Sequence, residues 1–199
     1  MKSIDQHATT RTAALAAFLT LAAGPALAHT GAGAVSGLAA GVAHPLGGLD
    51  HMLAMVAVGI LAVQQGGRAF WLVPATFVAT MVAGGALGVA GVPLPYVELG
   101  IVGSVIVLGA VVAAGWRMPL ALATPLAGAF AVFHGHAHGT EMPLSASALS
   151  YGVGFVIATA FLHAAGFGLG RTALALGRSL ALRVGGGAIA MAGLALAVS

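Results

Sequence analysis

The chain has 199 residues, of which 60% are hydrophobic and only 6% are charged. Because so few polar side chains cannot cover a water-facing surface, the composition predicts an integral membrane protein. The formal net charge of +3 comes from scattered Lys and Arg residues, and without a basic patch a nucleic-acid partner is excluded. The absence of Cys excludes disulfides and thiolate metal sites.

The first 28 residues have the pattern of a secretory signal peptide. A positively charged start precedes a short apolar run, and Ala-Leu-Ala at residues 26–28 forms an A-x-A cleavage site. The alternative, an uncleaved first helix, needs roughly 20 apolar residues, which this run does not supply. We predict a signal peptide over residues 1–28 and one transmembrane domain over residues 29–199. Cleavage makes His29 the N-terminus, where its amine and imidazole can chelate one metal ion.

The remaining chain is predicted to form about six membrane spans. A lead rich in Gly and Ala runs to residue 43, and Pro45, Gly47 and Gly48 disfavour a helix that continues through them. The first full span therefore begins near Leu49, with the lead as a short or re-entrant segment. The apolar runs do not alternate as barrel strands do, so the fold class is an all-α bundle. Further spans are expected at about residues 69–90, 96–115, 119–137, 146–170 and 180–198.

The arginines predict the orientation of these spans, because positive residues gather in cytoplasmic loops. With a periplasmic mature N-terminus, the inner loops and their flanks contain every arginine after residue 28, and the outer loops contain no Lys or Arg. We therefore predict a multi-pass protein of a bacterial inner membrane. The arginines concerned are Arg68, Arg117, Arg171, Arg178 and Arg183.

The first polar stretch, HPLGGLDHMLAMVAVG, runs from His44 to Gly59. It places His44, Asp50 and His51 at the mouth of an apolar segment, where ionisable groups are candidate functional residues. Asp50 and His51 lie about 100° apart on a helix, so both can bind one ion only at a broken helix start. The alternatives are that His44 hydrogen-bonds at a helix start and that Asp50 caps the span.

The second polar stretch, FHGHAHGTEMP at residues 133–143, offers three histidines and one glutamate. His134 and His138 are i and i+4 and share a helix face, a common way to hold one metal ion, whereas His136 points away. His136 either binds a second ion or hydrogen-bonds a neighbouring helix. Glu141 is a ligand, an acceptor that orients a His ring, or an exposed loop carboxylate.

With both stretches in view, the chain resembles the HupE/UreJ family of nickel and cobalt permeases. The family motif HPxxGxDHxxxxxxxG is matched from His44 to Gly59, and FHGxAHGxExP is matched from Phe133 to Pro143. Imidazole ligands alone leave Ni, Co, Zn and Cu open. The resemblance implies Ni²⁺ or Co²⁺ as the transported ion, with Zn²⁺ as a bound surrogate. Expected partners are the bilayer and a component that supplies nickel to hydrogenase or urease maturation; the oligomeric state stays open.

Two further residues are candidates for the ion path. Glu98 opens a span at the same outer depth and is either a helix-start acid or a path residue. His163 lies well down its span and is either a hydrogen-bonded core residue or an inner transfer ligand. The predicted metal site comprises His44, Asp50, His51, His134, His138, Glu141 and His29, with His136, Glu98 and His163 as supporting or path residues.

These features predict uptake of Ni²⁺ and/or Co²⁺ from periplasm to cytoplasm, driven by membrane potential or an ion gradient, with no catalytic residues. The chain has no Walker motif and does not itself hydrolyse ATP. One alternative is a membrane-embedded zinc hydrolase, in which three side chains and a water hold the metal. Another is a non-transporting metal sensor or accessory subunit. Metal-dependent cleavage would identify the first alternative, and binding without flux the second.

Overall fold

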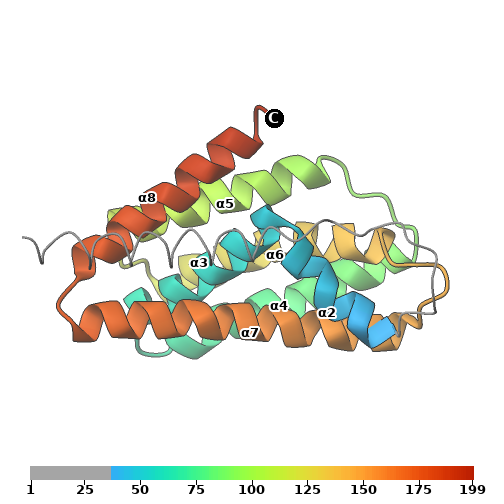
Figure 1. Cartoon of the computed structure of the whole chain (residues 1–199), viewed down its shortest axis with the longest axis horizontal. Coiled ribbons are helices and arrows are strands. Elements are labelled where there is room, and N and C mark those ends of the chain that lie inside the picture. Colours follow the sequence, from blue (N-terminus) through green and yellow to red (C-terminus); the bar gives the residue numbers. More distant parts are fainter. Residues whose placement is uncertain (1–36) are drawn as a thin grey trace, which may run out of the picture. The chain divides into compact units, whose positions relative to one another are not determined.

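A computed structural model describes residues 37–199, and this part of the chain is helical and contains no strand. The predicted all-α fold class is confirmed, while the predicted signal peptide and His29 lie outside the described residues. The helices are α2 (Gly37–Gly47), α3 (Leu49–Gln65), α4 (Ala69–Val89), α5 (Val97–Ala114), α6 (Leu120–Thr140), α7 (Ala148–Ala175) and α8 (Ser179–Leu196) (Figure 1).

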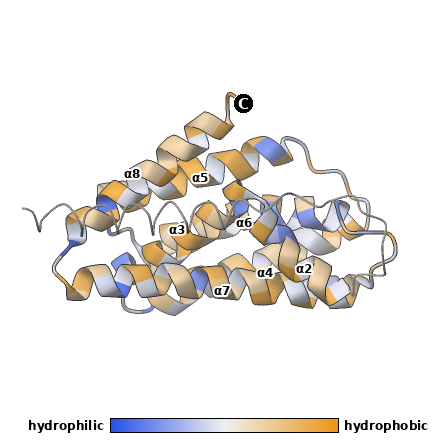
Figure 2. Cartoon of the chain, in the orientation of Figure 1, coloured by the Kyte–Doolittle hydropathy of each residue, from blue (hydrophilic) through white to orange (hydrophobic). Residues whose placement is uncertain are grey.

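Five of these helices, α4 to α8, are long and apolar enough to cross a membrane. Helices α2 and α3 together form a sixth candidate span, bent by 84° where they meet. The helices are mostly orange to white in Figure 2, with few blue, hydrophilic stretches, as expected where lipid replaces water. The prediction of about six spans is therefore confirmed.

The bend between α2 and α3 differs in detail from the sequence prediction. Pro45 and Gly47 lie within α2, and the interruption is confined to Gly48, whose backbone is extended (φ −102°, ψ 117°). Pro45 lacks the N–H that would bond to the Gly41 carbonyl, and α2 ends two residues later. A side chain at Gly48 would meet Asp50 Oδ1 at 2.8 Å and His51 Nδ1 at 3.0 Å. Glycine at this position thus leaves room for the Asp50–His51 pair.

Glycines join the helices into three closely packed groups: α4 with α6, α5 with α8, and α7 with α2 and α3. A Cβ added at Gly135 of α6 would strike the α4 backbone, and one at Gly109 of α5 would strike α8. Gly59, the last residue of the first motif, meets the α7 backbone, and Gly166 of α7 meets α3 in return. Small residues allow this approach where hydrophobic force cannot drive association in lipid.

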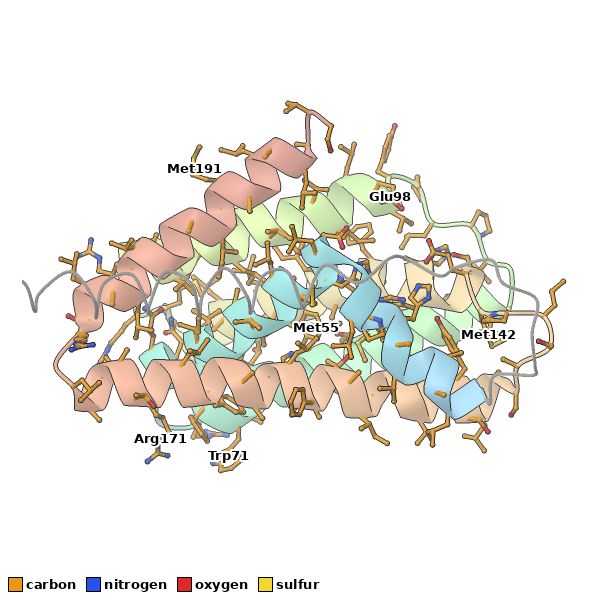
Figure 3. All side chains as sticks on the ribbon, in the orientation of Figure 1. Met55, Trp71, Glu98, Met142, Arg171 and Met191 are labelled. Carbon is orange, nitrogen blue, oxygen red and sulfur yellow. The ribbon has the colours of Figure 1, made fainter. Side chains whose placement is uncertain are left out.

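The polar residues of the bundle separate to two ends. The histidine end contains His44, Asp50, His138 and Glu141, and the arginine end contains Arg68, Arg117, Arg171, Arg178 and Arg183. Figure 3 shows Glu98 and Met142 toward the first end and Arg171 toward the second, with Met55 between them. The arginine end is tied together by polar contacts. Gln65 of α3 donates to the Trp116 carbonyl at 2.7 Å, and Arg183 of α8 donates to the Ala113 carbonyl at 2.9 Å.

Candidate metal site

The most exposed part of the site joins the end of α2 to the end of α6. His44, in the last turn of α2, donates from Nε2 to Glu141 Oε2 at 2.8 Å, although the two residues are 97 positions apart. His138, in the last turn of α6, places its ring centroid 4.6 Å from that of His44. One donor atom from each of these three residues lies within 4.8 Å of the other two. Since metal–ligand bonds are about 2.0–2.2 Å long, small side-chain rotations would bring all three donors onto one divalent ion.

The Asp50–His51 pair opens α3 on the inner side of this group. Asp50 Oδ1 accepts hydrogen bonds from the His51 backbone N–H and from Nδ1, both at 2.7 Å. This arrangement assigns the ring proton to Nδ1 and leaves the lone pair on Nε2, which is buried and has no hydrogen-bond partner. A carboxylate that accepts from one imidazole nitrogen while the other faces a metal ion is a common way to orient a ligand. In this geometry Asp50 orients His51.

His51 also contacts both histidines of the i, i+4 pair on α6. Its ring centroid lies 4.7 Å from that of His134 and 4.3 Å from that of His138. The pair therefore shares a helix face that is directed at α3. Both nitrogens of His138 and Nδ1 of His134 are buried and have no hydrogen-bond partner in the part of the chain that the structure describes. Because an unpaired buried polar atom costs about 1–3 kcal/mol, these two imidazoles are candidate ligands for a cation.

Ser104 of α5 completes the surroundings of His134, and no sequence motif indicated it. Its hydroxyl donates to the Ile101 carbonyl at 2.6 Å, so His134 Nε2–H donates to Ser104 Oγ at 2.8 Å. The proton thus sits on Nε2, and Nδ1 keeps its lone pair. Tyr151 of α7, whose ring centroid is 6.0 Å from that of His44, was missed as well, and its hydroxyl is buried without a partner. A single Ser or Tyr in an apolar span belongs to no motif, so the sequence alone does not distinguish it from a packing residue.

None of the three predicted supporting residues joins this group. His136 points away from the group, and its Nε2–H donates to the Val92 carbonyl at 2.7 Å. Of the two roles considered for His136, a hydrogen bond is therefore the one that the structure contains. Glu98 is exposed on the first turn of α5, and its side chain forms no hydrogen bond or ion pair with another described residue. His163 lies deeper in the bundle, on α7.

Within a multi-pass helical bundle, buried imidazoles beside two carboxylates form a ligand set that suits a borderline divalent metal. The chain belongs to the HupE/UreJ family, because the family model described as "HupE / UreJ protein" matches residues 16–196. It is also 45% identical over 175 residues to Protein HupE of Rhizobium leguminosarum bv. viciae, covering 87% of this chain and 92% of that protein. No solved structure matches. The family resemblance seen in the two motifs is confirmed.

Proposed function

We propose that the protein takes up Ni²⁺ or Co²⁺ through the histidine end and releases it at the arginine end. Membership of the HupE/UreJ family supports a role in nickel or cobalt transport. The observation that carries the finer proposal is the cluster of buried imidazole nitrogens without hydrogen-bond partners at His51, His134 and His138. Imidazole suits these borderline metals, whereas sites for Mg²⁺ or Ca²⁺ are built from oxygen ligands.

The exposed fraction of the candidate ligand side chains decreases along the proposed entry route. The side chains of His44 and Glu141 are 32% and 53% exposed, whereas His138 and His134 are buried. An incoming hydrated cation meets the carboxylate and imidazole of the exposed pair first and replaces the proton that they share. It then passes to His138, His51 and His134 as it loses water. The negative charge of Asp50 behind His51 offsets part of the cost of bringing a divalent ion into the membrane.

The direction of transport follows from the arginines. Under the positive-inside rule the arginine end faces the cytoplasm, so the histidine end faces the periplasm of a bacterial inner membrane. A divalent ion that enters at about −100 mV gains roughly 4.6 kcal/mol, since each charge is worth about 2.3 kcal/mol. At about 1.4 kcal/mol per factor of ten, that energy sustains an inward gradient of roughly a thousandfold. Membrane potential is therefore a sufficient driving force.

The test is ⁶³Ni²⁺ uptake into sealed vesicles that contain the purified, oriented protein and hold an inside-negative potential. Native protein is expected to take up metal, and His138→Ala is expected to abolish uptake, because His138 contacts both His44 and His51. His136→Gln is the matched control, since it changes a histidine on the same helix that points away from the group. No uptake by the oriented native protein, relative to protein-free vesicles, would overturn the proposal.

One observation favours the hydrolase alternative. An apolar cavity of about 600 Å³ lies between α4, α6 and α7, and His138 and Tyr151 are on its wall. Two histidines and a carboxylate are also a ligand set that catalytic zinc sites use. Incubating the purified, zinc-loaded protein with phospholipid vesicles and with peptides decides between the two functions. Metal-dependent cleavage would support a hydrolase, and intact substrates together with metal flux would support the permease.

A further inference from the structure

His163 is a buried histidine that the site at the histidine end does not include. It lies midway along α7, its side chain is 2% exposed, and its Nε2 has no hydrogen-bond partner. A histidine that serves packing alone would be expected to pair this nitrogen, because leaving it unpaired in the bundle costs free energy. The sequence left open whether His163 is a hydrogen-bonded core residue. The structure shows no partner for Nε2 among residues 37–199.

A single aromatic ring separates His163 from the histidine cluster. The ring centroid of Phe77, on α4, lies 5.8 Å from that of His134 and 5.3 Å from that of His163. Phe77 is completely buried, so its two faces and edges are occupied by these neighbours and by the core. Rotation of the Phe77 side chain would remove the ring that separates the two imidazoles.

Two weakly coordinating side chains lie next to Phe77 and His163, one helical turn toward the histidine end. Thr159 precedes His163 by four positions and shares its helix face, and Met81 follows Phe77 by four positions on α4. The Thr159 hydroxyl donates to Met81 Sδ at 3.6 Å, and both residues are buried. A hydroxyl and a thioether are weak ligands that a passing transition-metal ion can contact without being trapped.

We propose that His163 is an inner metal ligand, which receives the ion from His134 after it passes Phe77 and hands it toward the arginine end. The inference rests on the proposed transport function and extends it past the outer cluster. From His163 about 18 Å of α7 remain before its end, at 1.5 Å per residue. The acidic residues that the structure describes, Asp50, Glu98 and Glu141, all lie toward the histidine end. One neutral imidazole without a carboxylate holds a divalent ion weakly, and a transit site must be weak enough to release its ion.

The absence of Cys from the chain provides a direct test. His163→Cys introduces one thiol, which loses its proton on metal coordination and then gives a thiolate-to-metal charge-transfer band. Phe161→Cys is the matched control, because that position is two residues away on the same helix and 69% exposed at the bundle surface. Purified variants are titrated with Co²⁺ or Ni²⁺ while equilibrium dialysis reports total binding. We expect the band in His163→Cys and not in Phe161→Cys. Folded, metal-loaded His163→Cys without the band would overturn the proposal.

Flux measurements supply a second readout that a merely structural role would not produce. His163→Gln and His163→Ala are expected to lower ⁶³Ni²⁺ uptake roughly tenfold or more, while equilibrium binding at the histidine end changes by less than about twofold. Gel filtration and thermal unfolding identify any variant that fails to fold, and the conservative Gln variant then decides. Native uptake combined with unchanged uptake in folded His163→Gln would overturn the role of His163 alone. Absence of native uptake would instead overturn the proposed function.

Discussion

The histidine end and the inner half of the bundle handle polar groups in opposite ways. At the histidine end, imidazoles from α2, α3 and α6 gather with two carboxylates, and Asp50 and Ser104 fix the ring orientations of His51 and His134. In the inner half, between Phe77 and the arginine end, residues 37–199 contribute one imidazole, that of His163 on α7, and its Nε2 is unpaired among these residues. This difference fits the two functions proposed for these regions, capture at the histidine end and transit through the inner half. Capture needs several oriented ligands and negative charge, whereas transit needs few ligands that bind the ion weakly enough to release it.

The largest difference that we expect between the histidine end and the inner half is in their contribution to metal affinity. His51→Ala removes the residue that touches both His134 and His138, and we expect equilibrium binding of Ni²⁺ to weaken roughly 100-fold. Isothermal titration calorimetry on the purified protein measures this change. His163→Ala is the partner variant and should leave the same affinity nearly unchanged. Equal losses in the two variants would show that the two regions form one binding site.

A smaller loss is expected when the group that orients His51 is changed. Asp50→Asn keeps the size of the side chain but removes its charge, so it holds the His51 tautomer less firmly. We expect roughly tenfold weaker Ni²⁺ binding by equilibrium dialysis. Glu98→Gln removes one carboxylate at the same end without touching the cluster, and it should bind as the native protein does. If Glu98→Gln weakened binding as much as Asp50→Asn, general surface charge would explain both effects.

Ser104→Ala should have a milder effect. The variant deletes the acceptor for His134 Nε2–H, a buried hydrogen bond worth about 1 kcal/mol, and frees the ring to rotate. Binding of Ni²⁺ should weaken roughly fivefold at that energy. Ser104→Thr, which keeps the hydroxyl, should restore most of the affinity in the same titration. Failure of Thr to differ from Ala would argue that the hydroxyl does not orient His134.

The smallest effect is predicted for His136, the histidine that points away. His136→Gln loses its hydrogen bond to the Val92 carbonyl, which lowers stability by about 1 kcal/mol and shifts the melting temperature by about 2–4 °C. Thermal unfolding in detergent measures the shift, and Ni²⁺ affinity should stay within about twofold of the native value. A large fall in affinity would place His136 in the site after all.

The sequence predicted most helix boundaries because apolar length and breaker residues act locally. The span predicted at residues 96–115 is observed as α5, Val97–Ala114. The prediction ended the 146–170 span at Gly170, whereas α7 continues to Ala175, because a single glycine in a helix held by tertiary packing does not stop it. Pro45 was expected to lie outside a helix and instead lies in the last turn of α2, two residues before that helix ends.

The site was harder to predict than the helices. Spacing along α6 indicated that His134 and His138 share a face, because that depends on helical periodicity alone. The contacts of His44 with Glu141, of Ser104 with His134 and of Phe77 with His163 depend on which helices pack together and in which register. Isolated Ser, Phe and Met residues in apolar spans are indistinguishable from packing residues until that register is known.

The glycine contacts that hold the helices in groups also determine how the molecule can change shape. Backbone touches backbone within the α4–α6 pair and between α7 and its partners α2 and α3, so each group has no side chains there to rearrange and moves as one body. Both the histidine cluster and the Phe77–His163 contact lie between these two bodies. Sliding of one group against the other would open this interface without bending a helix.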